Sequence, residues 1–216
     1  MKYVYEFIGT FFLVITVGMT VLSPHAAELW APLAIGSILA VMIYAGGHVS
    51  GGHYNPAVSL AAFLRKKLSR NDLGFYWLAQ LLAGVAAAYV TIYFKGEPAK
   101  TFFEPEYFKA VLAEFFFTFA LCFVVLNVAT TKETAGNSYF GWAIGFTVLA
   151  GAYAMGSVSS AAFNPSVALG LSIMHISHWS NIWIFLVGNF LGAIAAALVV
   201  NAAHPEHNQK IDGFSK

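Results

Sequence analysis

The sequence has few charged residues, and this shortage excludes whole classes of protein. Charged residues make up 10% of the 216 residues, whereas soluble domains carry about 25%. Hydrophobic residues make up 59% and the mean hydropathy is +0.70, so the chain cannot present a polar surface to water. The net charge of +1 argues against a nucleic-acid partner, which would require a basic face. This composition predicts a polytopic helical membrane protein whose outer surface is covered by lipid.

Cysteine is nearly absent as well. Cys122 is the only one, which excludes an intrachain disulfide and a cysteine metal site, and its apolar surroundings predict a small buried hydrophobe. His48 and His53 lie near one another, but a metal site needs more convergent ligands, so we predict no metal and no cofactor. The first apolar run reaches about Ser23 without a small-residue cleavage site and is interpreted as a retained span rather than a signal peptide.

Long apolar runs dominate what is present. A spanning helix needs about 20 apolar residues, and six runs are long enough: about 3–24, 29–49, 73–94, 108–129, 138–157 and 180–201. Two shorter runs, about 55–65 and 164–174, would each cover about 16 Å of a hydrocarbon core that is about 30 Å thick. They could be surface amphipathic helices, but each opens with Asn-Pro, which defines a helix N-terminus. We therefore predict an all-α membrane protein with six transmembrane helices and two re-entrant half-helices.

The two halves of the chain repeat one another. The tripeptides Asn55-Pro56-Ala57 and Asn164-Pro165-Ser166 lie 109 residues apart (164 − 55 = 109). Each half would hold three spans and one half-span, and an odd number of crossings makes the second half enter from the opposite side. The prediction is an inverted repeat in one channel domain, 1–202, with halves of about 1–105 and 106–202. A polar cytoplasmic tail, 203–216, would follow.

The positive charges predict the orientation. The segment 65–70 holds four Lys and Arg residues within six positions, which places it in the cytoplasm by the positive-inside rule. Lys132, Lys210 and Lys216 fall on the same side, whereas Lys95 and Lys100 fall on the other. We expect a multi-pass protein of the cell (plasma or inner) membrane with both termini in the cytoplasm.

Three motifs together resemble the aquaporin, or major intrinsic protein, family. They are Gly51-Gly52-His53-Tyr54-Asn55-Pro56-Ala57-Val58, the second Asn-Pro box, and the Glu-Phe-x-x-Thr-Phe sequences that begin at Glu6 and Glu114. The resemblance covers roughly residues 3–201 and indicates a short, bacterial-type member. It implies a passive channel for water and small neutral solutes in the lipid bilayer, assembled as a homotetramer, with no cofactor and no enzymatic activity.

The two asparagines are the predicted centre of the pore. Two helix N-termini that meet at the midplane would each bring about half a positive charge. Asn55 and Asn164 would then offer N–H donors to a passing solute oxygen, and the field would disfavour protons and cations. An alternative is that both residues serve only as helix caps.

Residues around the asparagines complete the predicted pore. Non-helical backbone is tolerated at membrane depth where it lines a cavity, and the resemblance implies that carbonyls of the approach segments, Gly51, Gly52, His53 and Tyr54 and about 160–163, form one wall. Leu39 and Val148 are predicted to form the apolar wall opposite. Glu6 and Glu114 could be proton-relay groups, but the resemblance implies that they accept hydrogen bonds from the re-entrant loops.

The outer filter departs from the family pattern. The family has an arginine directly after the second box, where this chain has Val167. By family spacing, the other filter positions are Ile35, Ala152 and Ala161, which gives a wide, apolar quartet without charge. We predict passage of glycerol, urea or metalloid hydroxides such as arsenite. One alternative is a water-selective pore in which Tyr153, Phe163 or Phe140 fills the gap. Two others are a coupled carrier and a junction protein with a closed pore.

Overall fold

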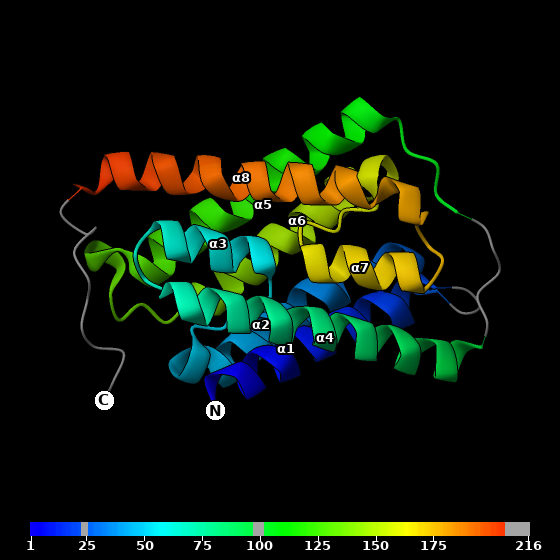
Figure 1. The fold of residues 1–216 in the computed structure, drawn as a ribbon, viewed down its shortest axis with the longest axis horizontal. Helices are drawn as coiled ribbons and strands as arrows, with labels where there is room; N and C mark the ends of the chain where they lie inside the picture. The colour runs from blue at the N-terminus through cyan, green and yellow to red at the C-terminus, as the bar shows by residue number, and fades with distance from the viewer. Residues whose placement is uncertain (23–25, 97–101, 206–216) are drawn as a thin grey trace.

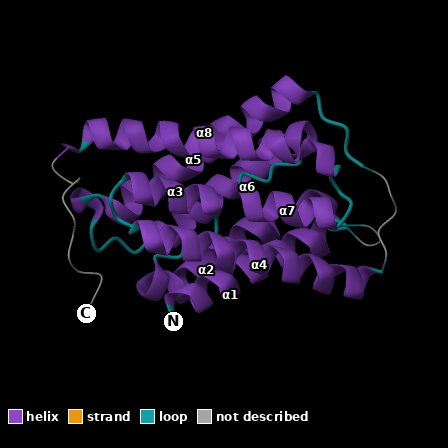
Figure 2. Cartoon of the chain, in the orientation of Figure 1, coloured by secondary structure: helices purple, strands orange, loops and turns teal. Residues whose placement is uncertain are grey.

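A computed structural model describes residues 1–22, 26–96 and 102–205 and shows a bundle of α-helices (Figures 1 and 2). Within these ranges six helices are long and apolar enough to cross a membrane: α1 (Lys2–Val21), α2 (Ala31–Ser50), α4 (Arg70–Lys95), α5 (Tyr107–Thr130), α6 (Phe140–Ser159) and α8 (Ile182–Ala203). Two short helices lie between them: α3 (Pro56–Leu64) and α7 (Pro165–Ile173). Three 3₁₀ turns complete the described helical structure: Glu28–Trp30, Lys132–Thr134 and Trp179–Asn181.

The predicted fold class is confirmed, and helix ends differ from the predicted ones by one to three residues. The start of α4 shows why. The sequence prediction began this helix at the first apolar residues, near 73, but the Ser69 hydroxyl accepts a hydrogen bond of 3.1 Å from the Asp72 N–H. That cap carries the helix back into its polar first turn at Arg70.

The half-helices begin where their Asn-Pro sequences predict. The Asn55 side chain accepts from the Ala57 N–H at 2.8 Å, and the Asn164 side chain accepts from the Ser166 N–H at 2.9 Å. Both asparagines have extended backbone, and the proline that follows each takes the first helical position. Each half-helix has nine residues and is about 14 Å long, roughly half a hydrocarbon core.

The two halves interlock. The first and last long helices of each half pack together, α1 with α4 and α5 with α8, and α2 packs against α6 across the molecule. Each half-helix also packs against the last helix of the other half: α3 lies on α8, and α7 lies on α4. As a result α3 and α7 lie end to end in the middle of the bundle, where they contact each other (Figure 1).

Small residues allow α2 and α6 to approach closely. A Cβ atom on Gly36 would lie 2.7 Å from the carbonyl oxygen of Gly145, which is too short for any side chain. Close backbone approach at small residues is a main source of helix association in lipid.

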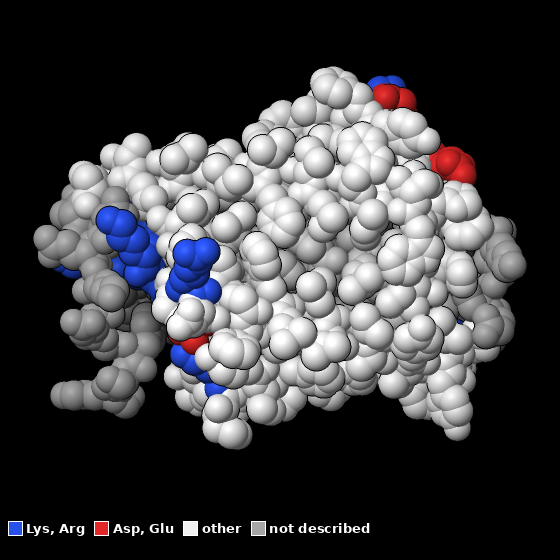
Figure 3. Space-filling view, in the orientation of Figure 1, with Lys and Arg blue, Asp and Glu red and all other residues white. Residues whose placement is uncertain are grey.

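The two described chain ends lie at the same end of the bundle as the basic segment 65–70. Lys2 forms an ion pair of 2.8 Å with Asp72 at the start of α4, and Arg65 donates to the His204 carbonyl oxygen at 3.1 Å after α8. Figure 3 shows charged side chains at the ends of the molecule and none across the broad middle of the visible face. Glu97, Lys100, Lys210 and Lys216, and the tail from 206 onward, lie outside the described residues.

Candidate functional site: a pore between two half-helices

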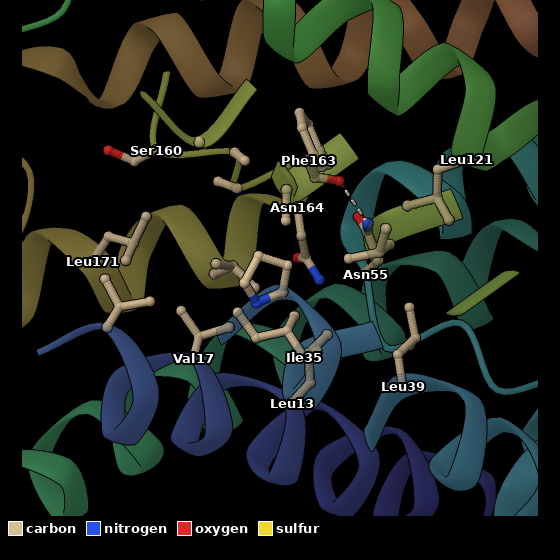
Figure 4. Close-up of a pocket in the computed structure, with 18 of the residues that line it drawn as sticks. Leu13, Val17, Ile35, Leu39, Asn55, Leu121, Ser160, Phe163, Asn164 and Leu171 are labelled. Atoms are coloured by element: carbon tan, nitrogen blue, oxygen red, sulfur yellow. Dashed lines mark hydrogen bonds between the residues drawn. The ribbon is translucent and has the colours of Figure 1, made fainter. Parts of the chain in front are cut away.

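The two asparagines join the half-helices across the centre of the molecule. Asn55 Nδ2 donates to the Phe163 carbonyl oxygen at 2.8 Å (Figure 4), and Asn164 Nδ2 donates to the Tyr54 carbonyl oxygen at 2.9 Å. Their Oδ1 atoms are occupied by the caps of α3 and α7. Each amide nitrogen has two N–H groups, so one N–H per asparagine is used in this bridge. Pro56, Ala57, Pro165 and Ser166 form the buried first turns beneath it.

A buried carboxylate holds the first re-entrant loop. Glu6 of α1 accepts four hydrogen bonds: Oε1 from the Ser50 hydroxyl at 2.7 Å and the His53 N–H at 3.0 Å, and Oε2 from the Tyr54 N–H at 2.7 Å and Gln80 Nε2 at 2.9 Å. These bonds satisfy backbone groups that have no helical partner. A carboxylate with four donors is well suited to such a loop because it has about four acceptor sites.

The second loop repeats this arrangement. Glu114 of α5 accepts from Ser159 at 2.8 Å, from the Ala162 N–H at 2.9 Å, from the Phe163 N–H at 2.7 Å and from Asn189 Nδ2 at 2.7 Å. Every donor occupies the position that matches its counterpart in the first half. The two carboxylates therefore bind the two loops in the same way, from opposite sides of the bundle.

Both loops use left-handed backbone. Gly51 and Gly52 have φ of 89° and 63°, and in the second loop Ser160 and Ala161 have φ of 70° and 48° at the matching positions. Only glycine adopts such angles without strain. Non-glycine residues there typically cost about 1–3 kcal/mol unless the surroundings hold them. The hydrogen bonds to Glu114 supply that restraint in the second loop.

A cavity of about 360 Å³ runs past both asparagines. All four predicted filter residues line it: Ile35, Ala152, Ala161 and Val167. Leu39, Val148, Gly52 and His53 line it as well, as predicted for the pore wall. Among the described residues that line it there is no Lys, Arg, Asp or Glu.

Two predicted wall residues, Gly51 and Tyr54, are not among the lining residues. The Tyr54 ring turns away into the helix bundle, where its hydroxyl donates to the Met42 carbonyl oxygen at 2.9 Å. It occupies space left by Gly9 of α1 and Gly46 of α2, where a Cβ would overlap it. Tyr54 thus meets the asparagine bridge through its carbonyl oxygen alone.

The aromatic residues considered as fillers of the filter lie elsewhere, with one exception. Tyr153 is 52% exposed on the outside, and its hydroxyl donates to the Leu29 carbonyl oxygen. Phe140 packs against Tyr44, away from the cavity. Phe163 does line the cavity, but its ring is buried and stacks on Phe117, with 5.4 Å between centroids.

Several residues that line the cavity were not predicted from the sequence. Leu13 and Val17 of α1 and Leu121 and Val125 of α5 line the cavity at matching positions (121 − 13 = 125 − 17 = 108). The same offset relates Glu6 to Glu114, so the repeat could have identified these four residues. Phe103, which also lines the cavity, follows no such pattern.

The two histidines near the first loop have different partners. The His48 ring packs edge-on against Tyr5, whereas His53 Nδ1 lies 3.0 Å from the Ser59 hydroxyl. Within the described ranges no three His, Cys, Asp or Glu side chains come together in a group that could hold a metal ion.

Comparisons with known proteins agree with this geometry. The family model described as "Major intrinsic protein" matches residues 1–200. Nodulin-26 of Glycine max is 33% identical over 214 residues, covering 93% of this chain and 76% of that protein. Probable aquaporin NIP4-2 of Arabidopsis thaliana is 30% identical, covering 93% and 73%. The X-ray structure of the aquaglyceroporin from Plasmodium falciparum superposes with a TM-score of 0.79 at 20% identity, covering 96% of this chain and 98% of that one.

Proposed function

Because the chain belongs to the major intrinsic protein family, a family of membrane channels, we propose that it conducts water and small uncharged solutes through a wide apolar filter. Glycerol, urea and metalloid hydroxides such as arsenite are the expected larger solutes. The observation that carries this proposal is the lining of the cavity: Ile35, Ala152, Ala161 and Val167 all line it, and none of their side chains has a charge or a donor group.

The size of these side chains supports a broad solute range. Two alanines and one valine contribute little bulk, and no arginine projects from the position of Val167. Apolar walls with a few placed polar groups are typical of sites for small neutral molecules. A solute that is larger than water therefore meets a low steric and electrostatic barrier at this filter.

The asparagine bridge supports exclusion of protons and cations. Each asparagine retains a second N–H beyond the one used in the bridge, and both residues line the cavity. The N-termini of α3 and α7 add positive field at the same place. A water molecule that accepts these N–H groups directs its own hydrogens away from the centre, which interrupts proton hopping.

Orientation and assembly follow from the same proposal. The basic segment 65–70 favours a cytoplasmic location for the end of the bundle that holds both described chain ends. Family membership supports a homotetramer in a cell membrane, with one pore in each subunit. The tail from 203 onward would then lie in the cytoplasm, after a single channel domain of about 1–202.

Stopped-flow light scattering on proteoliposomes tests the solute range. Water, urea, glycerol and arsenite are compared with protein-free liposomes, and the initial rate is followed as the gradient increases. We expect all four fluxes to exceed the control and to rise linearly with the gradient, because a channel does not saturate as a carrier does. Water flux without the other three would support the water-selective alternative, and no flux would support a closed-pore structural role.

A further inference from the structure

Phe103 lies at the outer mouth of the cavity and is absent from the predicted filter. It belongs to the connection between the two halves, just before α5, and it lines the cavity together with Ile176 from the loop after α7. The Phe103 N–H donates to the Ile176 carbonyl oxygen at 3.1 Å, and Phe103 pairs with Ser177 in an isolated parallel bridge. The backbone therefore fixes the position from which this ring projects.

The residues on either side of Phe103 attach the connection to the same loop. The Phe102 ring stacks on His178, with 3.6 Å between centroids and 23° between planes. Glu104 Oε1 lies 3.1 Å from His178 Nε2. His178 thus holds both neighbours of Phe103, and none of these three contacting side chains lines the cavity. We call Phe102, Glu104 and His178 the outer clamp.

The inverted repeat shows that Phe103 and the outer clamp have no counterpart in the other half. The loop after α7 has its counterpart after α3: His175 and Lys66 both have positive φ, 55° and 61°. The Ile176 N–H donates to the Leu171 carbonyl oxygen, and the Lys67 N–H donates to the Ala62 carbonyl oxygen, both at 2.9 Å. Ile176 lines the cavity, whereas Lys67 does not. The connection between the halves exists only once, so the repeat provides no counterpart of Phe103 at the other end of the cavity.

We propose that Phe103 is a further selectivity residue, which sets the upper size limit for solutes at the outer mouth while the outer clamp holds its ring in place. This inference rests on the proposed solute channel. If the filter of Ile35, Ala152, Ala161 and Val167 is as wide as proposed, Phe103 is the bulkiest side chain that a solute meets on the outer side of it. Phe103 contacts the solute, and the clamp residues act through it as positioning residues.

A size series in proteoliposomes tests this role. Water, urea, glycerol and a four-carbon polyol are compared for the wild type, Phe103→Ala and Phe103→Leu. We expect Phe103→Ala to raise the flux of the largest permeant solute about tenfold relative to water, which corresponds to roughly 1.4 kcal/mol of barrier. Phe103→Leu keeps some bulk, so its flux of the same solute relative to water should lie between those of the wild type and Phe103→Ala. If the alanine variant does not fold, the comparison of Phe103→Leu with the wild type is the test. Unchanged flux ratios across the series in both variants would overturn the proposal.

The clamp is tested from outside the cavity. Phe102→Ala should shift the size limit in the same direction as Phe103→Ala, and Phe102→Tyr, which keeps the stacking ring, should restore the wild-type ratio. Phe108→Ala is the matched control, because Phe108 lies on the first turn of α5 and its exposed side chain does not line the cavity. A shift in Phe108→Ala equal to that in Phe102→Ala would contradict the clamp.

Failure of the proposed solute range can be told apart from failure of this inference. A wild type that passes water alone would overturn the proposed solute range, and a gain of glycerol flux in Phe103→Ala would still establish Phe103 as the barrier.

Discussion

The side-chain amide of Asn55 donates a hydrogen bond of 2.8 Å to the carbonyl oxygen of Phe163, 108 residues away in the sequence. The reciprocal bond from Asn164 to Tyr54 is 2.9 Å long. Each asparagine therefore caps its own half-helix and binds the loop that leads to the other. The ends of the two half-helices are fixed relative to each other, which is the geometry that two converging donor groups require.

The bridge predicts similar costs for two substitutions far apart in the chain. Asn55→Ala and Asn164→Ala each remove a cap and leave a buried carbonyl oxygen without its donor, so each should destabilise the protein by about 2–4 kcal/mol. Ser69→Ala is the control, since it removes only the exposed cap of α4. Thermal unfolding in detergent measures the effect, and equal losses for Asn164→Ala and Ser69→Ala would exclude a stabilising bridge.

The carboxylates of Glu6 and Glu114 predict a second effect on stability. Glutamine at either position replaces one acceptor oxygen with a donor NH₂ group, which faces other donors in both orientations of the amide. For Glu6 these are the Tyr54 N–H and Gln80 at one oxygen position, or the Ser50 hydroxyl and the His53 N–H at the other. We expect Glu6→Gln and Glu114→Gln each to lower stability by about 3 kcal/mol or more. Glu133→Gln, on an exposed turn, is the control.

The same two variants distinguish support from proton relay. If the glutamates only hold the loops, refolded variants should conduct no more and no fewer protons than the wild type, as a pH-sensitive dye inside liposomes would show. A change in proton flux without a change in unfolding temperature would favour the relay.

The position of the Tyr54 ring predicts a rescue. Alanine at Gly46 would overlap the Tyr54 hydroxyl, whereas alanine at Gly9 would overlap the ring carbons. Removing the hydroxyl with Tyr54→Phe should therefore recover most of the stability lost in Gly46→Ala and little of that lost in Gly9→Ala. Unfolding of the single and double variants measures both couplings.

A matched control is available on α4. A Cβ on Gly74 would meet no atom within 4 Å, so Gly74→Ala should be neutral or slightly stabilising because alanine favours helix over glycine. Equal rescue of Gly46→Ala and Gly9→Ala by Tyr54→Phe would contradict this position of the Tyr54 ring.

The burial of Cys122 predicts that thiol reagents do not inhibit the channel. Its thiol is fully buried in α5 and does not line the cavity. Thiol reagents should leave water flux unchanged, whereas Ala152→Cys, at a lining position, should make the channel sensitive to them. Inhibition of the wild type by a mercurial would contradict the burial of Cys122.

Local signals made much of this architecture predictable. The apolar runs set the number of spans, and Asn-Pro set the starts of α3 and α7 because cap and first-turn preferences act within a few residues. The direction of the Tyr54 ring was not predictable, since it depends on gaps left by glycines of two other helices. The place of Phe103 was not predictable either, because the connection has no periodic pattern and is positioned by contacts with residues 176–178.

The most direct test of the wide, arginine-free filter is the ratio of glycerol to water permeability in the wild type and in Val167→Arg, reconstituted at equal protein density. Arginine at this buried, cavity-lining position adds bulk and a fixed charge to the quartet. We predict that the wild type passes both solutes and that Val167→Arg retains water flux while losing most glycerol flux. An unchanged ratio in Val167→Arg, or a wild type that excludes glycerol, would contradict the proposal that the absence of arginine from this filter lets the larger solutes pass.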